Sequence, residues 1–347
     1  MRVLFDMGHP AHVHLFRIAR RHLIDRGHEV FVVARQKDVT HELLKAYGID
    51  FVPGSRIRTG GGRFLELFEW FVRVRREIVR HHIDVVVSNG SPAGAWAARV
   101  VGIPHLAFND TESSREQRML YGPASTKIFT PRCLLANYGP KQVRYDGIHD
   151  LAYLRPEHFV PDPRVREELG VGPVEDYAIM RFVSWDATHD WLQKKTGVDA
   201  YRALSSELAR HGAIFISAEG PLPEDLKPYR LPIEPHRFHD ALAFATIVVG
   251  DGCTPATEAA VLGTPSLLIS SVSDTRGYVR FLRRRGLLEA AKTPREGIEK
   301  LRGMMTEPNR DNIGRSREQL LAETIDVAAY IADQCESYGN EGASGRS

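Results

Sequence analysis

Short apolar runs alternate with longer amphipathic segments through the first half of the chain. Short apolar runs suit strands buried on both faces, and apolar residues at helical spacing suit the helices that cover such a sheet. The pattern predicts strands at 2–5, 29–34, 51–53, 85–88, 105–109 and 127–130. It predicts helices at 13–26, 39–47, 64–82 and 93–101. This alternation indicates an α/β domain with a parallel sheet.

The second half repeats the alternation after a proline-rich connection at 149–173. It predicts strands at 177–180, 214–217, 247–249 and 266–269, and helices at 199–211, 240–245, 255–262, 278–285, 294–304 and 316–335. We therefore expect two doubly wound, Rossmann-like domains that face each other across a cleft, with ligands at the carboxyl ends of the strands. The expected boundaries are 1–150 and 174–315, a helix at 316–336 that packs back on the first domain, and a disordered tail at 337–347.

The segment 247–269 carries the clearest functional signal in the chain. Its sequence, IVVGDGCTPATEAAVLGTPSLLI, predicts a buried strand, a turn at 250–252, a helix and a second buried strand. Pro255 suits the first helical turn, and Gly263 suits the end of the helix. A helix that starts at the carboxyl end of a parallel strand is a ready site for an anion. Glu258, one turn into the helix, could then reach a ribose, although an ordinary βαβ unit without a ligand is the alternative.

This segment resembles the donor-nucleotide motif of GT-B enzymes, above all the non-hydrolysing UDP-GlcNAc 2-epimerases. It is also similar to the GlcNAc transferase that makes the lipid intermediate of peptidoglycan. Asp251, Gly252, Glu258 and the run 262–265 carry the resemblance. Over residues 1–335 the chain also resembles an uncharacterised GT-B-like family, the domain of unknown function 354. These resemblances imply the GT-B fold and a nucleotide-sugar substrate.

The glycine-rich turn departs from the pattern of those families. Cys253 and Thr254 stand where a second glycine is usual, so the Thr254 hydroxyl would donate where a backbone N–H normally serves. The resemblance also implies a basic residue after the strand at 177–180, and Arg181 stands there. Its guanidinium suits a bidentate contact with the leaving diphosphate, whereas a solvated charged loop is the alternative.

Two further loops of the second half match ligand-binding positions of GT-B enzymes. His236 and Phe238 lie in the loop that lines the nucleobase pocket in such folds. Asp274 and Arg276 lie where the related enzymes contact the donor sugar or the phosphates. The resemblance therefore implies that these four residues belong to the donor site.

The first loop of the chain places three histidines within six residues. Gly8 permits a tight turn, and His9 or His12 could take a proton from a sugar hydroxyl near neutral pH. The peptidoglycan-type transferases have a histidine-containing loop at this position. Metal binding by His12 and His14, or helix capping alone, are the alternatives.

Two later loops test the epimerase resemblance. The epimerases carry a His-Gly-Asp with a catalytic Asp where this chain has Asn89, Gly90 and Ser91. A second catalytic acid of that family would correspond to Asp110 or Glu112, with helix capping as the alternative. The chain therefore lacks at least one epimerase acid.

Composition narrows the function classes. The formal net charge of +2 gives no reason to expect a nucleic-acid partner. Three widely spaced cysteines form no CxxC pair, and we expect no metal site. Since no stretch reaches the length of a membrane span and the start does not resemble a signal peptide, we expect a cytoplasmic protein.

The predicted helix 64–82 raises the question of membrane contact. It carries a broad apolar arc, formed by Leu67, Phe68, Phe71, Val72, Val74, Ile78 and Val79, with arginines opposite. Packing against the sheet is the leading interpretation of this arc. Peripheral contact with the inner membrane face is the alternative, supported by the basic, glycine-rich loop at 54–63 and by Trp70 at the edge of the arc.

The leading hypothesis is a metal-independent GT-B glycosyltransferase that uses a nucleotide-diphosphate sugar, a UDP-sugar by resemblance, and no other cofactor. The acceptor would be an unidentified sugar or a lipid-linked or polysaccharide-linked acceptor. A UDP-GlcNAc-type 2-epimerase and a non-catalytic nucleotide-sugar binding protein are the alternatives. The sequence carries no signal for the oligomeric state.

Overall fold

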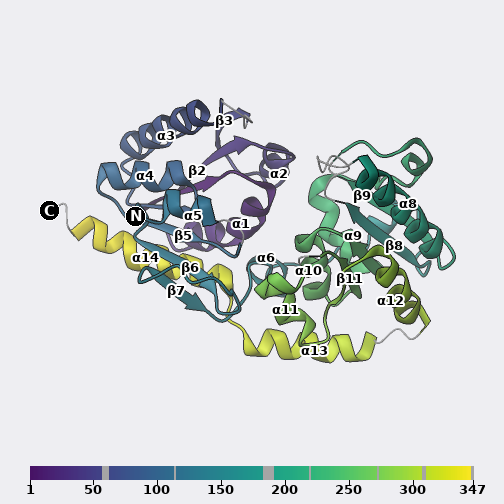
Figure 1. Ribbon diagram of the computed structural model, residues 1–347. Coiled ribbons are helices and arrows are strands. Elements are labelled where there is room, and N and C mark those ends of the chain that lie inside the picture. Colours follow the sequence, from purple (N-terminus) through teal and green to yellow (C-terminus); the bar gives the residue numbers. More distant parts are fainter. Residues whose placement is uncertain are drawn as a thin grey trace. The chain divides into compact units, whose positions relative to one another are not determined.

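The computed structural model describes residues 1–56, 62–112, 115–182, 191–218, 220–271, 273–306 and 310–344. The chain forms two compact units (Figure 1). Unit 1 comprises Met1–Tyr153 together with Thr324–Ser347, and unit 2 comprises Leu154–Glu323. Each unit is built on one parallel sheet, which confirms the α/β fold class predicted from the alternating pattern.

The sheet of unit 1 has seven parallel strands in the order β3-β2-β1-β4-β5-β6-β7. Their bounds are β1 (Arg2–Met7), β2 (Glu29–Gln36), β3 (Val52–Arg56), β4 (Val85–Ser88), β5 (His105–Phe108), β6 (Lys127–Pro131) and β7 (Gln142–Tyr145). Six of these strands match the predicted ones, whereas β7 was not predicted. The spatial order reverses between β1 and β4, so the switch point of the sheet lies there.

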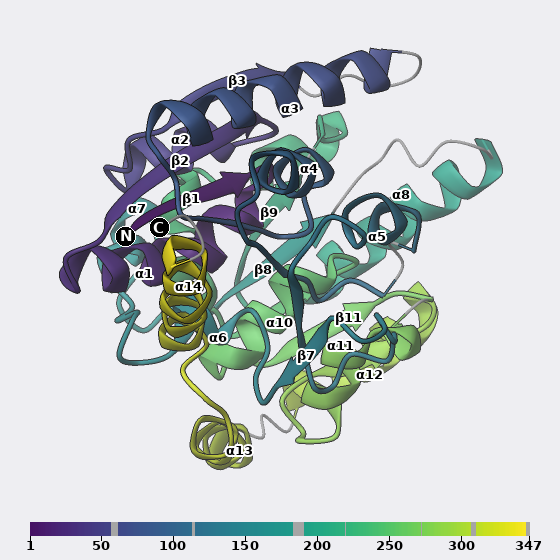
Figure 2. The ribbon, with the colours of Figure 1, turned by 90° about the vertical axis from the view of Figure 1, so that its left-hand side faces the viewer.

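Helices cover both faces of this sheet. They are α1 (Pro10–Asp25), α2 (Thr40–Ala46), α3 (Arg63–Arg80), α4 (Pro92–Val101), α5 (Arg115–Tyr121) and α14 (Val327–Ser344), whereas the short α6 (Leu151–Leu154) spans the boundary between the two units. Helix α3 packs along α4, and α4 contacts α5. Helix α14 packs along α1 (Figure 2).

The sheet of unit 2 has five parallel strands in the order β12-β11-β10-β8-β9. Their bounds are β8 (Tyr177–Phe182), β9 (Ala213–Ala218), β10 (Ile247–Gly250), β11 (Ser266–Ile269) and β12 (Glu289–Ala291). The order reverses between β8 and β10, which places the loops after these two strands at the switch point.

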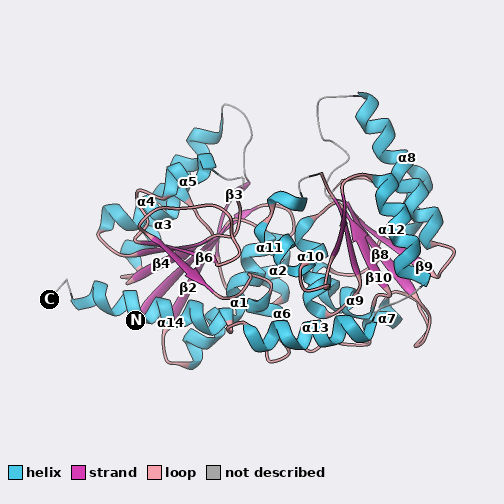
Figure 3. Ribbon diagram, turned by 60° about the horizontal axis from the view of Figure 1, so that its bottom comes forward, coloured by secondary structure: helices cyan, strands magenta, loops and turns pink. Residues whose placement is uncertain are grey.

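Helices flank the sheet of unit 2 as well (Figure 3). They are α7 (Val165–Glu168), α8 (Trp191–Leu208), α9 (Phe238–Phe244), α10 (Cys253–Leu262), α11 (Gly277–Arg283), α12 (Pro294–Thr306) and α13 (Arg310–Glu323). Three 3-10 turns accompany them: η2 (Glu224–Tyr229), η3 (Pro235–Arg237) and η4 (Ser273–Thr275).

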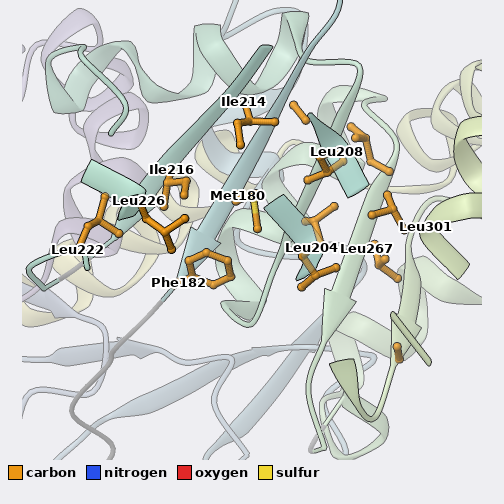
Figure 4. Packing of buried hydrophobic residues seen from close by; sticks show 14 residues of the cluster. Met180, Phe182, Leu204, Leu208, Ile214, Ile216, Leu222, Leu226, Leu267 and Leu301 are labelled. Carbon is orange, nitrogen blue, oxygen red and sulfur yellow. The ribbon is translucent and has the colours of Figure 1, made fainter. Parts of the chain in front are cut away.

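Apolar side chains fill the space between the sheet of unit 2 and two of its helices. Leu204 and Leu208 of α8 and Leu301 of α12 pack with Met180 and Leu267 of the central strands (Figure 4). All five side chains are buried. This packing fixes the strands whose carboxyl ends carry the donor-motif loops.

The C-terminal segment differs from the prediction of one helix at 316–336 followed by a disordered tail. The chain forms two helices, α13 in unit 2 and α14 in unit 1. The break has a local cause, because Asp326 Oδ1 accepts the N–H groups of Ala328 and Ala329 at 2.9 and 3.1 Å and so caps a new helix. Helix α14 continues to Ser344, where disorder was predicted, and Tyr338 packs edge-on against Phe129.

Gly250 provides a test of the close approach between β10 and β8. A Cβ at this position would collide with the carbonyl oxygen of Arg181 on the neighbouring strand. We expect Gly250→Ala to lower the free energy of unfolding by about 3 kcal/mol, because the clash is with backbone that cannot turn aside. Urea unfolding followed by circular dichroism measures this loss.

Gly303→Ala is the matched control. Gly303 is exposed within α12, and a Cβ there meets no atom within 4 Å. This substitution should raise the free energy of unfolding by about 1 kcal/mol, because alanine has the higher helix propensity. Equal effects of the two substitutions would contradict this account of the strand contact.

Candidate functional site

The strands of unit 1 all run in one direction, so the loops that follow them meet along one edge of the sheet. The loops after β1 and β4 lie at the switch point, where doubly wound sheets bind their ligands. The predicted residues His9, Asp110 and Glu112 lie in loops of this edge, and His12 lies in the first turn of α1.

Backbone N–H groups fix the rings of His9 and His12. His9 Nδ1 accepts the N–H of Ala11 at 3.1 Å, which makes His9 the N-cap of α1. His12 Nδ1 accepts the N–H of Gly8 at 3.1 Å. A neutral imidazole carries one hydrogen, so a ring that accepts at Nδ1 carries that hydrogen on Nε2. Both histidines therefore offer a hydrogen-bond donor at Nε2 rather than the lone pair of a base.

The electrostatic surroundings keep these two rings neutral. Burial and, to a smaller extent, the charge of Lys37 lower the pKa of His9 to about 4, against the opposing effect of Asp38. Burial likewise lowers the pKa of His12 well below its usual value, assisted by the positive charge of Arg35 among others. Neutral rings agree with the donor geometry at Nε2.

Asp110 and His149 form a pair at the same edge of the sheet. Asp110 follows β5 and His149 follows β7, and His149 Nδ1 lies 3.2 Å from Asp110 Oδ2. A carboxylate facing Nδ1 holds the ring hydrogen there and leaves the lone pair on Nε2. His149 is only 7% exposed, and its Nε2 has no hydrogen-bond partner within the part of the chain that the structure describes. The pair thus holds an oriented base whose Nε2 is itself buried.

The pKa of His149 is lowered from its ordinary value. Burial causes this shift, and the negative charge of Asp110 opposes it. Glu112 is the other predicted acid, and its Oε1 lies 3.5 Å from a backbone N–H, that of Leu135. Of the two predicted acids, Asp110 is therefore the one that orients a histidine.

A buried carboxylate lies beside Ser91, the position at which the related epimerases carry an acid. Asp6 accepts the indole N–H of Trp70 at 3.1 Å and bonds with the Ser91 side chain. Ser91 in turn accepts the N–H of Gly94 at 3.2 Å and caps α4. Burial raises the pKa of Asp6, and Arg35 opposes this shift. Because Asp6 is 1% exposed, it supports the start of α4 and does not replace the missing acid.

A histidine between two serines stabilises the loop that precedes α4. Ser88 Oγ accepts the N–H of Ser91 at 2.9 Å, so its own hydroxyl donates to His105 Nε2 at 2.9 Å. His105 Nδ1 then donates to Ser125 Oγ at 2.9 Å. His105 is fully buried, and burial lowers its pKa to about 3. This neutral histidine links the ends of β4 and β5.

In unit 2 the donor motif folds as a strand, a turn and a helix. Helix α10 starts at Cys253, two residues before the predicted start, and no side chain caps it at Gly252. Thr254 is exposed at the second helical position, and Cys253 is half-buried. The first N–H groups of α10 and the Thr254 hydroxyl are therefore positioned to bind an anion.

Two other predicted residues of the switch point are held by neighbours. Arg181 Nη1 donates to Ser217 Oγ at 2.9 Å. Asp251 Oδ2 accepts the hydroxyl of Tyr201 at 2.8 Å. Tyr201 also lies against Phe182, with ring centroids 3.7 Å apart. These contacts order the side chains at the carboxyl ends of β8 and β10.

Glu258, the predicted ribose ligand, lies in a closed environment. Its side chain is 5% exposed, and its Oε1 lies 3.0 Å from His239 Nε2. Phe159 packs edge-on against the His239 ring. The partner histidine fixes the direction of the Glu258 carboxylate, so a ribose could contact only its small exposed part.

Of the remaining predicted donor residues, three are half-buried and Asp274 is exposed but ion-paired. Phe238 packs partly against the buried cluster around α7 and α9, and His236 is half-buried in η3. Asp274 pairs with Arg283 at 2.6 Å and Lys292 at 3.0 Å, and hydrogen bonds from both cations lower its pKa. Arg276, half-buried, supplies the N-cap position of α11.

No sequence motif reveals three partner residues of the candidate sites: His149, Tyr201 and His239. His149 lies in the proline-rich connection, Tyr201 lies in a helix, and His239 follows directly after the predicted pocket residue Phe238. Only strand pairing and helix packing bring them to Asp110, Asp251 and Glu258.

Among the described residues, no group of three or more His, Cys, Asp or Glu side chains could hold a metal ion. In the same residues, no helix has both the length and the apolar character needed to cross a membrane.

Comparisons with known proteins agree with this fold. The family model for glycosyltransferase family 4 matches residues 11–127, about a third of the chain. No curated protein sequence matches the chain.

Solved structures of similar fold cover nearly the whole chain. One is MnaA of S. aureus with UDP, with a TM-score of 0.74, 13% identity and coverage of 98% of this chain and 97% of that one. Another is the UDP-GlcNAc 2-epimerase of Neisseria meningitidis bound to UDP-GlcNAc, with a TM-score of 0.68, 14% identity and coverage of 96% and 99%. The spinosyn forosaminyltransferase SpnP has a TM-score of 0.65, 17% identity and coverage of 98% and 99%. The chain therefore has the GT-B fold, which glycosyltransferases and UDP-GlcNAc 2-epimerases share.

The buried His105 predicts how stability depends on pH. Its pKa is about 3 in the folded protein against 6.5 for the free side chain, so acid favours the unfolded chain, which binds the proton. His105 alone should lower the free energy of unfolding by about 1.4 kcal/mol per pH unit as the pH drops below the unfolded pKa, in addition to the contributions of the other buried histidines. Urea unfolding across this range measures the slope, and His105→Asn should reduce it by that amount. An unchanged slope in the variant would contradict a neutral His105.

Proposed function

We propose that the protein is a metal-independent glycosyltransferase that uses a nucleotide-diphosphate sugar, with UDP as the nucleotide. The observation that carries this proposal is the Asp110–His149 pair, which holds a buried Nε2 with no hydrogen-bond partner among the described residues, close to the strand-end edge of unit 1. The family 4 match covers residues 11–127, which include Asp110 and end before His149. This match and the GT-B fold support the same reaction class.

In the proposed reaction, His149 Nε2 takes the proton of an acceptor hydroxyl. The acceptor oxygen then forms a bond to the anomeric carbon, while the bond from that carbon to the diphosphate breaks. The nucleoside diphosphate leaves with the electron pair of that bond. Asp110 stabilises the imidazolium that forms, as a carboxylate does beside a general base. His9 and His12, which offer N–H donors, would bind oxygen atoms of the substrates.

The donor would be held by unit 2. The start of α10 and the Arg181 guanidinium supply positive potential for the diphosphate. Glu258, oriented by His239, would accept a hydroxyl of the ribose. This set of groups neutralises the leaving group without a metal ion, so we propose no cofactor beyond the donor itself.

Sugar-nucleotide 2-epimerization is the second candidate, because several solved structures of similar fold are UDP-GlcNAc 2-epimerases. Ser91 in place of an acid and the burial of Asp6 make it the weaker one. The glycosyltransferase proposal has three further parts. We propose that the chain belongs to the domain of unknown function 354, that it is cytoplasmic, and that its acceptor is linked to a lipid or polysaccharide.

Nucleotide binding tests the donor site. Glu258→Gln should weaken UDP binding about tenfold to a hundredfold, because it replaces a charge-assisted hydrogen bond with a neutral one. It is preferable to an alanine substitution, since the amide can still bond to His239. Calorimetric titration measures the affinity, and UDP at about a hundred times its dissociation constant should stabilise the wild type by about 2.7 kcal/mol.

The control for this experiment is Glu299→Gln, which removes a charge from an exposed position on α12. It should bind UDP as the wild type does. If neither UDP nor a UDP-sugar binds the wild-type protein, the proposed donor site does not exist.

Loss of the base tests the catalytic step. We expect His149→Ala to slow UDP release from a bound UDP-sugar about 10²- to 10⁴-fold, because a general base contributes that much. UDP affinity should stay unchanged, and added imidazole should restore part of the rate. Rate measurements on wild type, His149→Ala and His12→Ala compare the two histidines; a larger loss with His12→Ala would transfer the base role to His12.

Deuterated water separates the reaction classes. An epimerase must incorporate deuterium at C2 of UDP-GlcNAc, whereas the proposed transferase leaves C2 untouched, and proton magnetic resonance distinguishes the two. Deuterium at C2 would overturn the transferase proposal in favour of the second candidate. Tight UDP-sugar binding without turnover of any kind would indicate a non-catalytic binding protein.

A further inference from the structure

The apolar residues of α3 form two separate sets. Trp70, Val74 and Ile78 are buried against the sheet and α4, as core packing predicted. A second set points to solvent, with exposed fractions between 48% and 62%: Leu65, Phe68, Val72 and Val79. Core packing therefore explains only part of the arc, and Trp70 lies in the core instead of at an interface.

The exposed set forms a stripe along the outer face of α3. Its spacing of three, four and seven residues keeps the side chains on one side of a helix. Four exposed arginines accompany the stripe: Arg73, Arg75, Arg76 and Arg80. Among the described side chains of α3, Glu69 is the one exposed acid. The stripe is thus apolar along its length and basic at its borders.

Neighbouring helices extend this surface. Trp96 and Val100 of α4 and Met119 and Leu120 of α5 are also exposed. The Trp96 indole donates to the Leu120 carbonyl at 2.8 Å, which ties the two helices together, and the Arg99 guanidinium lies over the Trp96 ring. Since α3 packs along α4 and α4 contacts α5, these residues belong to one helical layer (Figure 2).

A hollow of about 410 Å³ lies beside the stripe. Phe68, Trp70 and Val72 contribute apolar walls, Arg73 and Arg76 contribute guanidinium groups, and Glu69 and Glu77 contribute carboxylates. Arg73 Nη1 donates to the Pro53 carbonyl at 3.0 Å, which holds this arginine in place. The hollow thus has an apolar surface and charges of both signs, and the preference for anionic lipid rests on the exposed arginines along the helix rather than on the hollow itself.

We propose that this layer, centred on the outer face of α3, docks unit 1 on an anionic lipid surface. Large apolar side chains bordered by arginines enter the boundary between headgroups and acyl chains, and exposed tryptophan favours the same depth. The complementary charges select anionic over neutral lipids. The proposal is independent of the proposed glycosyl transfer, because it concerns a surface on the outer helices and not the strand-edge loops.

Vesicle sedimentation tests the docking surface with the full-length protein. The wild type should sediment with vesicles of phosphatidylcholine and phosphatidylglycerol and remain in solution with phosphatidylcholine alone. Arg76→Gln with Arg80→Gln should lower the partition coefficient about 30-fold, because each arginine near an anionic surface contributes about 1 kcal/mol. Phe68→Ser with Val72→Ser should lower it about tenfold or more, because the apolar contact is lost.

Matched controls lie on unit 2. Val160→Ser with Val174→Ser changes two highly exposed valines, and Arg295→Gln changes an arginine whose side chain is 90% exposed. Both should partition like the wild type, and UDP binding should be unchanged in every variant that folds. The proposal is overturned if the wild type does not bind anionic vesicles, or if the α3 variants bind them as well as the controls do. A loss of UDP binding with vesicle binding intact would count against the donor site and leave the docking surface standing.

Discussion

The parallel direction of all strands is the constraint on which both candidate sites depend. In each unit the loops that follow the strands meet at one edge, however far apart they lie in the sequence. Asp110 follows β5 and His149 follows β7, and the intervening strand β6 sets the spacing between them. In the same way Arg181 and Ser217 come together because β8 and β9 are neighbours. The functional side chains are thus placed by backbone hydrogen bonds between strands that carry no chemistry of their own.

Hydrogen-bond direction decides which histidine of unit 1 is suited to act as a base. His9 and His12 are the conspicuous residues of the sequence, yet each uses Nδ1 to accept a backbone N–H. Each ring is therefore left with a donor at Nε2. His149 has the reverse arrangement, since a carboxylate occupies the Nδ1 side. Burial works in the same direction for all three, because it lowers the pKa of each ring and so favours its neutral form.

In unit 2, neighbouring side chains orient the groups of the donor motif before any ligand binds. His239 fixes Glu258, and Tyr201 fixes Asp251. Ordering these groups in advance lowers the conformational entropy that ligand binding would otherwise remove. The departure from the usual glycine turn leaves α10 with an exposed hydroxyl at Thr254, in the first turn of the helix. The donor site that we propose therefore combines backbone and side-chain groups.

The sequence by itself determined the two α/β sheets, six of the seven strands of unit 1, and the strand-turn-helix segment with Glu258. Hydrophobic periodicity, glycine and proline act through local backbone preferences, so these features can be predicted from neighbouring residues. Strand β7 and the extension of α14 to Ser344 depended on partners farther along the chain, whereas the break between α13 and α14 came from a local cap at Asp326. Only the tertiary structure decided that His149 faces Asp110, that Glu258 faces His239, and that α3 has an exposed apolar stripe besides its buried one. The reason is physical: a side chain's hydrogen-bond direction and burial are properties of the surfaces that pack around it, and those surfaces come from distant segments.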